Sequence, residues 1–143
     1  MKQDKISWLN ELKYKYFNIF PYPDTPFVKT EDGSVYWIDF KGNKPSHIGI
    51  GKNARHCGLI KLFWKKDTLE IWDIILPPKY RGNGLGTQLL FWLISYARQE
   101  NMQYLWGMVV TDPEQYFDRT MVWYLRHGFE RVTPTSNHIR MKL

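Results

Sequence analysis

The segment Arg81-Gly82-Asn83-Gly84-Leu85-Gly86 constrains this chain most, because it lies between a strand-like run and an amphipathic helix. The run before it ends in Pro77-Pro78, and proline cannot continue a sheet ladder. Glycines allow positive φ and let a ligand approach the backbone amides closely. The loop amides and the positive end of the helix therefore favour a phosphate or pyrophosphate, and Arg81 adds a permanent cation. The helix after the loop has one apolar face, made by Leu89, Leu90, Leu93, Ile94 and Ala97.

Other glycine loops fit this segment less well. A P-loop needs a Lys-Ser/Thr pair after its last glycine, where this chain has Thr87-Gln88. A dinucleotide-binding fingerprint needs a further glycine three residues beyond Gly86 and an acid on the next strand, and Leu89 and the run 104–110 supply neither. A purely structural glycine turn stays open as the remaining alternative.

The rest of the sequence predicts one α/β domain over residues 1–143, with a divergent N-terminal part over about 1–40. We expect a first helix over 6–20, a proline-rich connection, and no clear strand before residue 34. Gly42, Pro45, Gly49 and Gly51 indicate a turn-rich connection. The remaining expected elements are strands at 34–40, 58–64, 69–76, 104–110, 129–132 and 139–143, and helices at about 87–100 and 118–127.

Composition excludes several classes of protein. No apolar run approaches the roughly 18–20 residues of a membrane span, and no signal-peptide core follows the basic N-terminus, so we expect a cytoplasmic protein, monomeric or homodimeric. Cys57 is the only cysteine, which excludes an internal disulfide and favours a small buried side chain over a nucleophile. The four histidines show no metal-ligand spacing, so no metal is expected.

Positive charge is concentrated in one part of the chain. Residues 41–66 contain no acid and seven basic residues, namely Lys41, Lys44, Lys52, Arg55, Lys61, Lys65 and Lys66. Such a stretch favours an anionic partner, which could be cofactor phosphates, a nucleic acid or an acidic substrate. A solvated loop and hairpin edge explains it equally well.

Two segments together resemble the GNAT superfamily of N-acetyltransferases. The loop Arg81–Gly86 matches the family pattern Arg/Gln-x-x-Gly-x-Gly/Ala between a strand and a helix, and the strand 69–77 looks like the family's fourth strand. Trp123-Tyr124-Leu125-Arg126-His127-Gly128-Phe129 resembles the second signature, an aromatic-Tyr-x-x-x-Gly-Phe segment. The resemblance covers about residues 58–143. It implies a mixed, mostly antiparallel sheet flanked by helices, with splayed central strands that form an acyl-CoA cleft.

The resemblance also implies which residues hold acetyl-CoA as co-substrate. Main-chain groups of Ile74 and Leu76 would pair with the pantetheine arm, and an amide near Ile74 or Ile75 would polarise the thioester carbonyl. The pyrophosphate would bind to the start of the helix, at Arg81, Gly82, Asn83, Gly84, Leu85, Gly86 and Thr87. The family's usual first strand and two acceptor-shaping helices have no clear counterpart in residues 1–33, so the sequence leaves the acceptor unassigned.

Three residues are candidates for the chemistry of acyl transfer to an amine. By its place in the second signature, Tyr124 would donate a hydrogen bond or a proton to the leaving thiolate. Glu70 and Asp73 are the acids on the preceding strand and, being three residues apart, lie on opposite faces unless a bulge intervenes. Asp73 is the favoured base because it is nearer to the place where family members often carry an acid. His127 is a weaker candidate, since helix C-termini attract cations for dipole reasons alone.

Three functions remain open from the sequence. The first is an N-acetyltransferase that acts on a small amine or a protein amine. The second keeps this chemistry but takes a charged tRNA, with only the basic residues 41–66 in its favour. The third is an acyl-CoA sensor or interaction module of the same fold without turnover.

Overall fold

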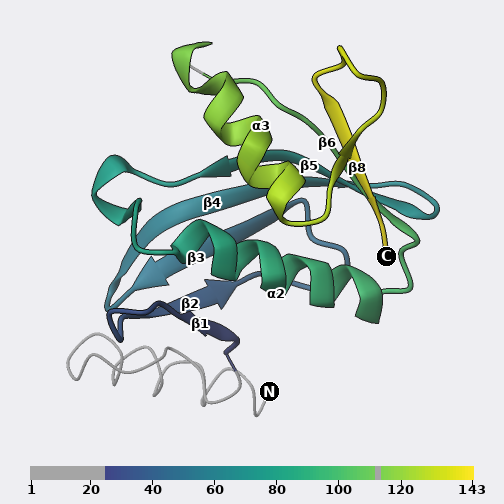
Figure 1. Cartoon of the computed structure of the whole chain (residues 1–143). Coiled ribbons are helices and arrows are strands. Elements are labelled where there is room, and N and C mark those ends of the chain that lie inside the picture. The colour runs from purple at the N-terminus through teal and green to yellow at the C-terminus, as the bar shows by residue number, and fades with distance from the viewer. Residues whose placement is uncertain (1–24, 112–113) are drawn as a thin grey trace. The chain divides into compact units, whose positions relative to one another are not determined.

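The computed structural model describes residues 25–111 and 114–143 of the chain. Their strands form one mixed sheet in the order β1-β2-β3-β4-β5-β6-β8-β7 (Figure 1). The strands are β1 (Phe27–Lys29), β2 (Val35–Asp39), β3 (His47–Lys52), β4 (Arg55–Trp64), β5 (Thr68–Ile75), β6 (Tyr104–Met108), β7 (Glu130–Arg131) and β8 (His138–Lys142). The α-helices are α2 (Leu85–Gln99) and α3 (Phe117–Arg126), and single 3-10 turns are η1 (Pro78–Tyr80) and η2 (Glu114–Tyr116). The predicted fold class, a mixed and mostly antiparallel sheet with helices, is confirmed.

The described residues form two compact units. The first contains the residues up to Ile60 together with Ile74–Trp92. In it, β1, β2 and β3 pair as consecutive antiparallel strands, with Phe27 opposite Trp37 and Trp37 opposite Gly51. Its fully buried side chains are mostly apolar and include Ile38, Ile48, Ile50, Ile60, Leu89 and Leu90.

The second unit contains Lys61–Asp73 and Leu93–Leu143. Here β5 and β6 run parallel, with Thr68 opposite Tyr104, whereas β8 pairs antiparallel with both β6 and β7. The buried side chains come from β5, β6 and β8, from the second half of α2 and from the residue before β7, and include Leu69, Leu93, Leu105, Phe129 and Ile139.

Two strands correct the predictions for the first part of the chain. Residues 27–29 form β1, although no strand was expected before residue 34, because a short edge strand tolerates the preceding Pro26. The Pro26 carbonyl accepts a hydrogen bond from the Ile38 amide at 2.8 Å. Residues 47–52 form β3 rather than a turn-rich connection. The predicted helix over 6–20 lies outside the described residues.

Gly51 in β3 is needed for side-chain packing rather than for a turn. A Cβ at Gly51 would lie 1.7 Å from the indole ring of Trp37, so only glycine leaves room for this ring across the β2–β3 pair. Trp37 is 4% exposed, and its Nε1 donates to the Asn53 carbonyl at 2.8 Å. The ring also stacks edge-on against His56. Cross-strand burial of one tryptophan thus holds β3 in place.

Several predicted helices and strands are confirmed, with ends that agree with the structure to within about two residues. The predicted apolar face of α2 is buried throughout, from Leu89 to Ala97. β5 ends just before Pro77-Pro78, as the ladder argument requires. The second helix stops before Gly128, whose φ of 97° is the left-handed conformation that favours glycine. In the described part of the chain, no helix is long and apolar enough to span a membrane.

Candidate functional site

The glycine loop in the first unit turns the chain from η1 into α2. Gly82 and Gly84 have φ of 81° and 84°, conformations that most other residues adopt only with strain. Gly86 differs from them, because it is already the second residue of α2. Arg81 fixes the start of the loop: its Nε donates to the Leu76 carbonyl at 2.7 Å. The guanidinium is therefore anchored through one nitrogen and keeps its two terminal nitrogens for other partners.

The Asn83 side chain sets the first turn of α2. Its Oδ1 accepts from the Leu85 amide at 3.1 Å, which satisfies one of the orphan donors of the helix start. This contact fixes the orientation of the carboxamide, so that Nδ2 donates to the Tyr36 hydroxyl oxygen at 3.2 Å. One predicted pyrophosphate-binding amide, that of Leu85, is thus capped by a side chain of the same loop.

The strand before the loop is irregular. Near its start, the Ile71 carbonyl oxygen lies 3.5 Å from the place that a Cβ would take at Gly107 on β6. Near its end, the Ile75 carbonyl oxygen lies 2.9 Å from the Cβ position of Gly58 on β4. A regular strand would send both carbonyls to the same edge, since they are four residues apart. The alternation breaks between them, as at a β-bulge, and the adjacent Trp72 and Asp73 are both exposed.

The parallel ladder between β5 and β6 also stops at this place. Its last pair is Ile71 with Gly107, although β6 continues to Met108. β5 beyond Ile71 is therefore no longer paired with β6, and this part of the strand includes Ile74 and Ile75, the first residues that the sequence assigned to cofactor binding.

Two predicted catalytic residues, Asp73 and Tyr124, lie within electrostatic reach of each other in the second unit. Tyr124 is on α3, with its ring against Trp123 and Phe129 at centroid distances of 4.8 and 5.2 Å. Burial, and to a smaller extent the negative charge of Asp73, raises the pKa of Tyr124 to about 12. The phenol is therefore neutral, and a hydrogen-bond donor, throughout the physiological pH range.

Glu70 is engaged elsewhere. Its carboxylate is buried, pairs with Lys65 Nζ at 2.5 Å and accepts from Trp72 Nε1 at 3.0 Å. Burial raises its pKa, but these two donors outweigh burial, so the pKa of Glu70 is lower than usual. Glu70 and Asp73 thus have different partners. Lys65 and Trp72 give Glu70 a structural role in the β4–β5 hairpin.

Two other sequence candidates also have structural contacts. The Nδ1 of His127 lies 2.6 Å from the Trp123 carbonyl oxygen; a carbonyl can only accept, so this nitrogen carries the proton. Cys57 is buried, and burial raises the pKa of its thiol, against smaller opposing contributions from Lys52 and Lys79. A thiol of raised pKa is a poor nucleophile at neutral pH.

The basic stretch separates into different environments. Lys52 and Arg55 line a pocket in the first unit, whereas Lys65 pairs with Glu70 in the second. The pocket is also lined by Lys79, Tyr80 and Tyr36, and the sequence gave no reason to place these residues together. A basic residue directly after the Pro77-Pro78 stop was the one available signal, since it lies next to the glycine loop.

The comparisons with known proteins agree with this geometry. The Acetyltransferase (GNAT) family matches residues 6–129 of the chain. An uncharacterised N-acetyltransferase of Methanocaldococcus jannaschii is 30% identical over 115 residues, which cover 79% of this chain but only 46% of that relative. The chain thus spans less than half the length of this curated relative.

Two solved structures share the fold. The PaiA N-acetyltransferase of Thermoplasma acidophilum, solved in complex with coenzyme A, has a TM-score of 0.57 at 17% identity, over 68% of this chain and 60% of that one. The ribosomal-protein-S18-alanine N-acetyltransferase of Escherichia coli has a TM-score of 0.58 at 19% identity, over 71% of each chain. With the family match over most of its length, the chain belongs to the GNAT family of acetyltransferases.

Proposed function

We propose that this protein transfers an acetyl group from acetyl-CoA to a primary amine by direct attack in a ternary complex. The observation that carries the proposal is the glycine loop, with left-handed Gly82 and Gly84, at the N-terminus of a helix in a chain of this family. Backbone amides at such a helix start, together with the helix dipole, favour a pyrophosphate. The Thermoplasma acidophilum structure, a complex with coenzyme A, supports the same co-substrate.

The loop and the irregular strand divide cofactor binding between them. We assign the pyrophosphate to the loop Arg81–Gly86 and Thr87, together with the free end of the Arg81 guanidinium. The amides of Arg81 and Leu85 already donate to the Pro78 carbonyl and to Asn83 Oδ1, so the other amides of this segment would bind it. The pantetheine arm would pair with main-chain groups of Ile74 and Leu76, where β5 has left its ladder. The Leu76 carbonyl already accepts from Arg81, so its amide is the group that this assignment leaves for the arm.

Acetyl-CoA supplies a thioester whose carbonyl carbon the neutral amine attacks, and the C–S bond then breaks to release a thiolate. An amide at Ile74 or Ile75 would stabilise the developing oxyanion. Asp73, an exposed carboxylate beside Tyr124, would attract the ammonium form of the acceptor and accept a proton from it directly or through water.

The raised pKa of Tyr124 limits what the phenol can do. Full proton transfer from a phenol of pKa about 12 to a thiolate of ordinary pKa is uphill by roughly 5 kcal/mol. We therefore assign Tyr124 a hydrogen bond to the departing sulfur rather than complete proton transfer before the C–S bond breaks. The second candidate function is an acyl-CoA sensor or interaction module of this fold that does not turn over.

One experiment separates these functions. Acetyl-CoA affinity is measured by calorimetry, and thiol release is followed with polyamines, amino acids, aminoglycosides, peptides and aminoacyl-tRNA as acceptors. An acetyltransferase binds acetyl-CoA and releases CoA with at least one acceptor class. Binding without release from any acceptor supports the sensor, and failure to bind any CoA ester contradicts both.

The tRNA-directed alternative has its own test. It depends on the basic stretch 41–66. Of these residues, Lys52 and Arg55 line a pocket and Lys65 pairs with Glu70. Affinity for tRNA at low ionic strength, falling steeply as salt is added, would favour it. Negligible affinity at low ionic strength would remove it. The cytoplasmic location and the monomeric or dimeric state predicted from the sequence remain predictions.

A further inference from the structure

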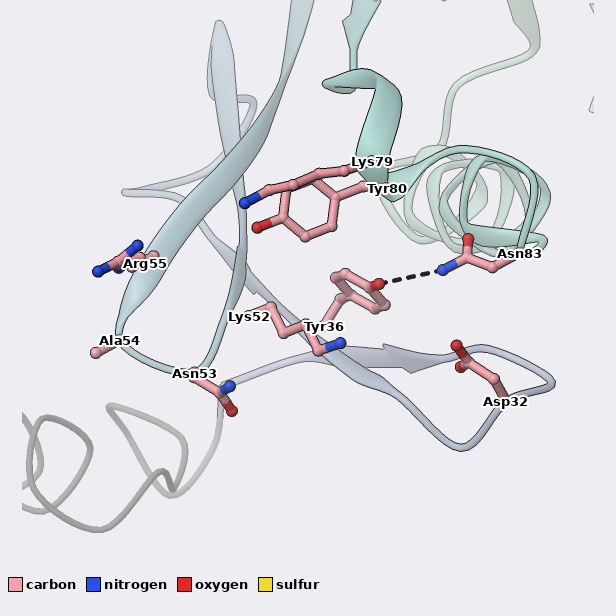
Figure 2. Close-up of a pocket in the computed structure, with 9 residues that line it drawn as sticks. All are labelled: Asp32, Tyr36, Lys52, Asn53, Ala54, Arg55, Lys79, Tyr80 and Asn83. Atoms are coloured by element: carbon pink, nitrogen blue, oxygen red, sulfur yellow. Dashed lines mark hydrogen bonds between the residues drawn. The ribbon is translucent and has the colours of Figure 1, made fainter.

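A pocket of about 530 Å³ in the first unit has no assigned ligand. It lies where the β1–β2 turn, the β3–β4 turn, η1 and the glycine loop come together (Figure 2). The residues that line it are Asp32, Tyr36, Lys52, Asn53, Ala54, Arg55, Lys79, Tyr80 and Asn83. This volume is within the range of small-molecule sites in proteins and exceeds what a single small ion needs.

The charge of the lining is positive. Lys52 and Arg55, on either side of the β3–β4 turn, and Lys79 in η1 contribute three cations. Among the described residues, no carboxylate lies within ion-pair distance of any of the three. The single acid, Asp32, is occupied by its own turn, where Thr30 Oγ1 and the Ser34 amide donate to it at 2.5 and 2.9 Å.

Lys52 and Lys79 are held by contacts that leave ammonium protons available. Lys52 Nζ donates one hydrogen bond, to Ser34 Oγ at 3.2 Å, and lies 5.5 Å from the Tyr36 ring centroid. Lys79 Nζ lies 5.0 Å from the ring centroid of Tyr80. Since an ammonium has three donors, both lysines retain donors for a ligand.

The Tyr36 hydroxyl is an independent indication of a bound acceptor. This side chain is 1% exposed, and its oxygen accepts from Asn83 Nδ2 at 3.2 Å (Figure 2). The Leu85 amide fixes the orientation of Asn83, so the tyrosine must be the acceptor in this pair. No described residue accepts the proton of the phenol itself. A buried donor without an acceptor is costly, and a ligand oxygen at this wall would satisfy it.

We propose that this pocket binds a phosphate monoester, with Lys52, Lys79 and the Tyr36 hydroxyl as donors to its oxygens and Arg55 at the rim. A phosphate offers two negative charges and several acceptors, which suits two ammonium groups and a hydroxyl in one pocket better than a single carboxylate does. The monoester has two sources. It is either the 3′-phosphate of CoA, in which case the inference depends on the proposed function, or a separate phosphorylated molecule.

Calorimetry with CoA and with 3′-dephospho-CoA distinguishes the sources, using the wild type, Lys52→Met, Lys79→Met and Tyr36→Phe. Lys66→Met, in the exposed β4–β5 turn, is the control for the loss of one charge. If the pocket holds the 3′-phosphate, the wild type prefers CoA by about ten-fold or more, the pocket variants lose this preference and the control keeps it.

A second titration adds glycerol 3-phosphate to protein saturated with 3′-dephospho-CoA. If a separate molecule uses the pocket, CoA and 3′-dephospho-CoA bind the wild type equally, glycerol 3-phosphate binds saturably, and the pocket variants weaken it. Equal binding of both CoA forms with no saturable binding of glycerol 3-phosphate overturns the proposal. If no CoA ester binds at all, the proposed function fails, but glycerol 3-phosphate still reports on the pocket.

Tyr36→Phe keeps the buried ring and removes the hydroxyl, and with it both the phenol donor and the acceptor of Asn83 Nδ2. We expect it to weaken the phosphate-dependent part of binding several-fold, while its thermal unfolding stays close to that of the wild type. Unchanged phosphate-dependent binding in a folded Tyr36→Phe protein would remove the hydroxyl from the site.

Discussion

Asp73 and Tyr124 lie close enough for the carboxylate to raise the pKa of the phenol, which burial has already raised, to about 12. This pair brings together the acid of an irregular strand and the tyrosine of the second family signature. The phenol is thereby held in its neutral form, ready to donate, next to an exposed negative charge.

Tyr124→Phe tests the hydrogen bond to the leaving sulfur. The variant keeps the ring contacts with Trp123 and Phe129, so we expect a folded protein with unchanged acetyl-CoA affinity. Its kcat should fall by about 10²-fold, the low end of acid–base contributions. Steady-state thiol release together with calorimetry measures both quantities, and an unchanged kcat would assign Tyr124 to the core alone.

Alkaline stability reports on the same side chain. The pKa of Tyr124 is about 10 in the unfolded chain and about 12 in the folded one, so the folded protein holds its proton longer. Its contribution of roughly 3 kcal/mol is complete below pH 10 and is lost as pH rises towards 12. Urea unfolding across this range should show a shallower fall for Tyr124→Phe than for the wild type. If both lose stability in parallel, the phenol does not titrate in this way.

Neutralising Glu70 should mainly lower the unfolding free energy, whereas neutralising Asp73 should mainly lower kcat/KM. Glu70→Gln weakens the contact with Lys65, so we expect a loss of about 1–2 kcal/mol in unfolding free energy with little effect on turnover. Asp73→Asn should leave stability nearly unchanged and lower kcat/KM by about ten-fold. Chemical unfolding and initial rates on the two purified variants give the four values. The reverse pattern would make Glu70 the base.

Arg81→Lys separates anchoring from phosphate binding. Arginine can donate through Nε to the Leu76 carbonyl and still present two nitrogens to a phosphate, whereas a lysine ammonium is a single point charge. We expect acetyl-CoA affinity to fall by about ten-fold although the net charge is unchanged. Equal affinity of both proteins in calorimetry would show that the charge alone matters.

Gly51→Ala tests the packing of β3 under Trp37. The added methyl would collide with the indole, and overpacking of this kind costs about 1–3 kcal/mol or more. Gly49→Ala is the matched control, because its new methyl would meet the exposed His56 side chain at 3.1 Å, which can move away. Thermal unfolding should show a much larger loss for the first substitution, and equal losses would contradict the packing argument.

The glycines of β3 also show why part of this fold escaped prediction. Gly49 and Gly51 indicate turns when the sequence is examined locally, yet Ile48 and Ile50 alternate with them and are fully buried. The deciding contact is a tryptophan ring from another strand, and no local pattern contains it. The strand, loop and helix around residues 69–97 were predictable because proline, glycine and apolar periodicity all act within a short segment.

Some features of the candidate site could likewise be predicted from the sequence, and others could not. Asp73, Tyr124 and the loop Arg81–Gly86 could be chosen from motif spacing, since each lies in a recognisable segment. The pairing of Glu70 with Lys65 and Trp72 could not, because it depends on side-chain directions within a hairpin. The pocket combines residues from 32 to 83, and only the folded chain brings Tyr36 to Asn83.

Gly58 has a consequence for comparing sequences within the family. A methyl group there would lie 2.7 Å from Leu76 Cδ2 and 2.9 Å from the Ile75 carbonyl oxygen. A chain with a larger residue at position 58 would therefore need a smaller one at position 76, and would have to move the Ile75 carbonyl, which precedes the Leu76 carbonyl that anchors Arg81. Positions 58 and 76 should consequently vary as a pair. The residues at these two positions, although outside both signatures, should therefore indicate whether the phosphate loop keeps its shape.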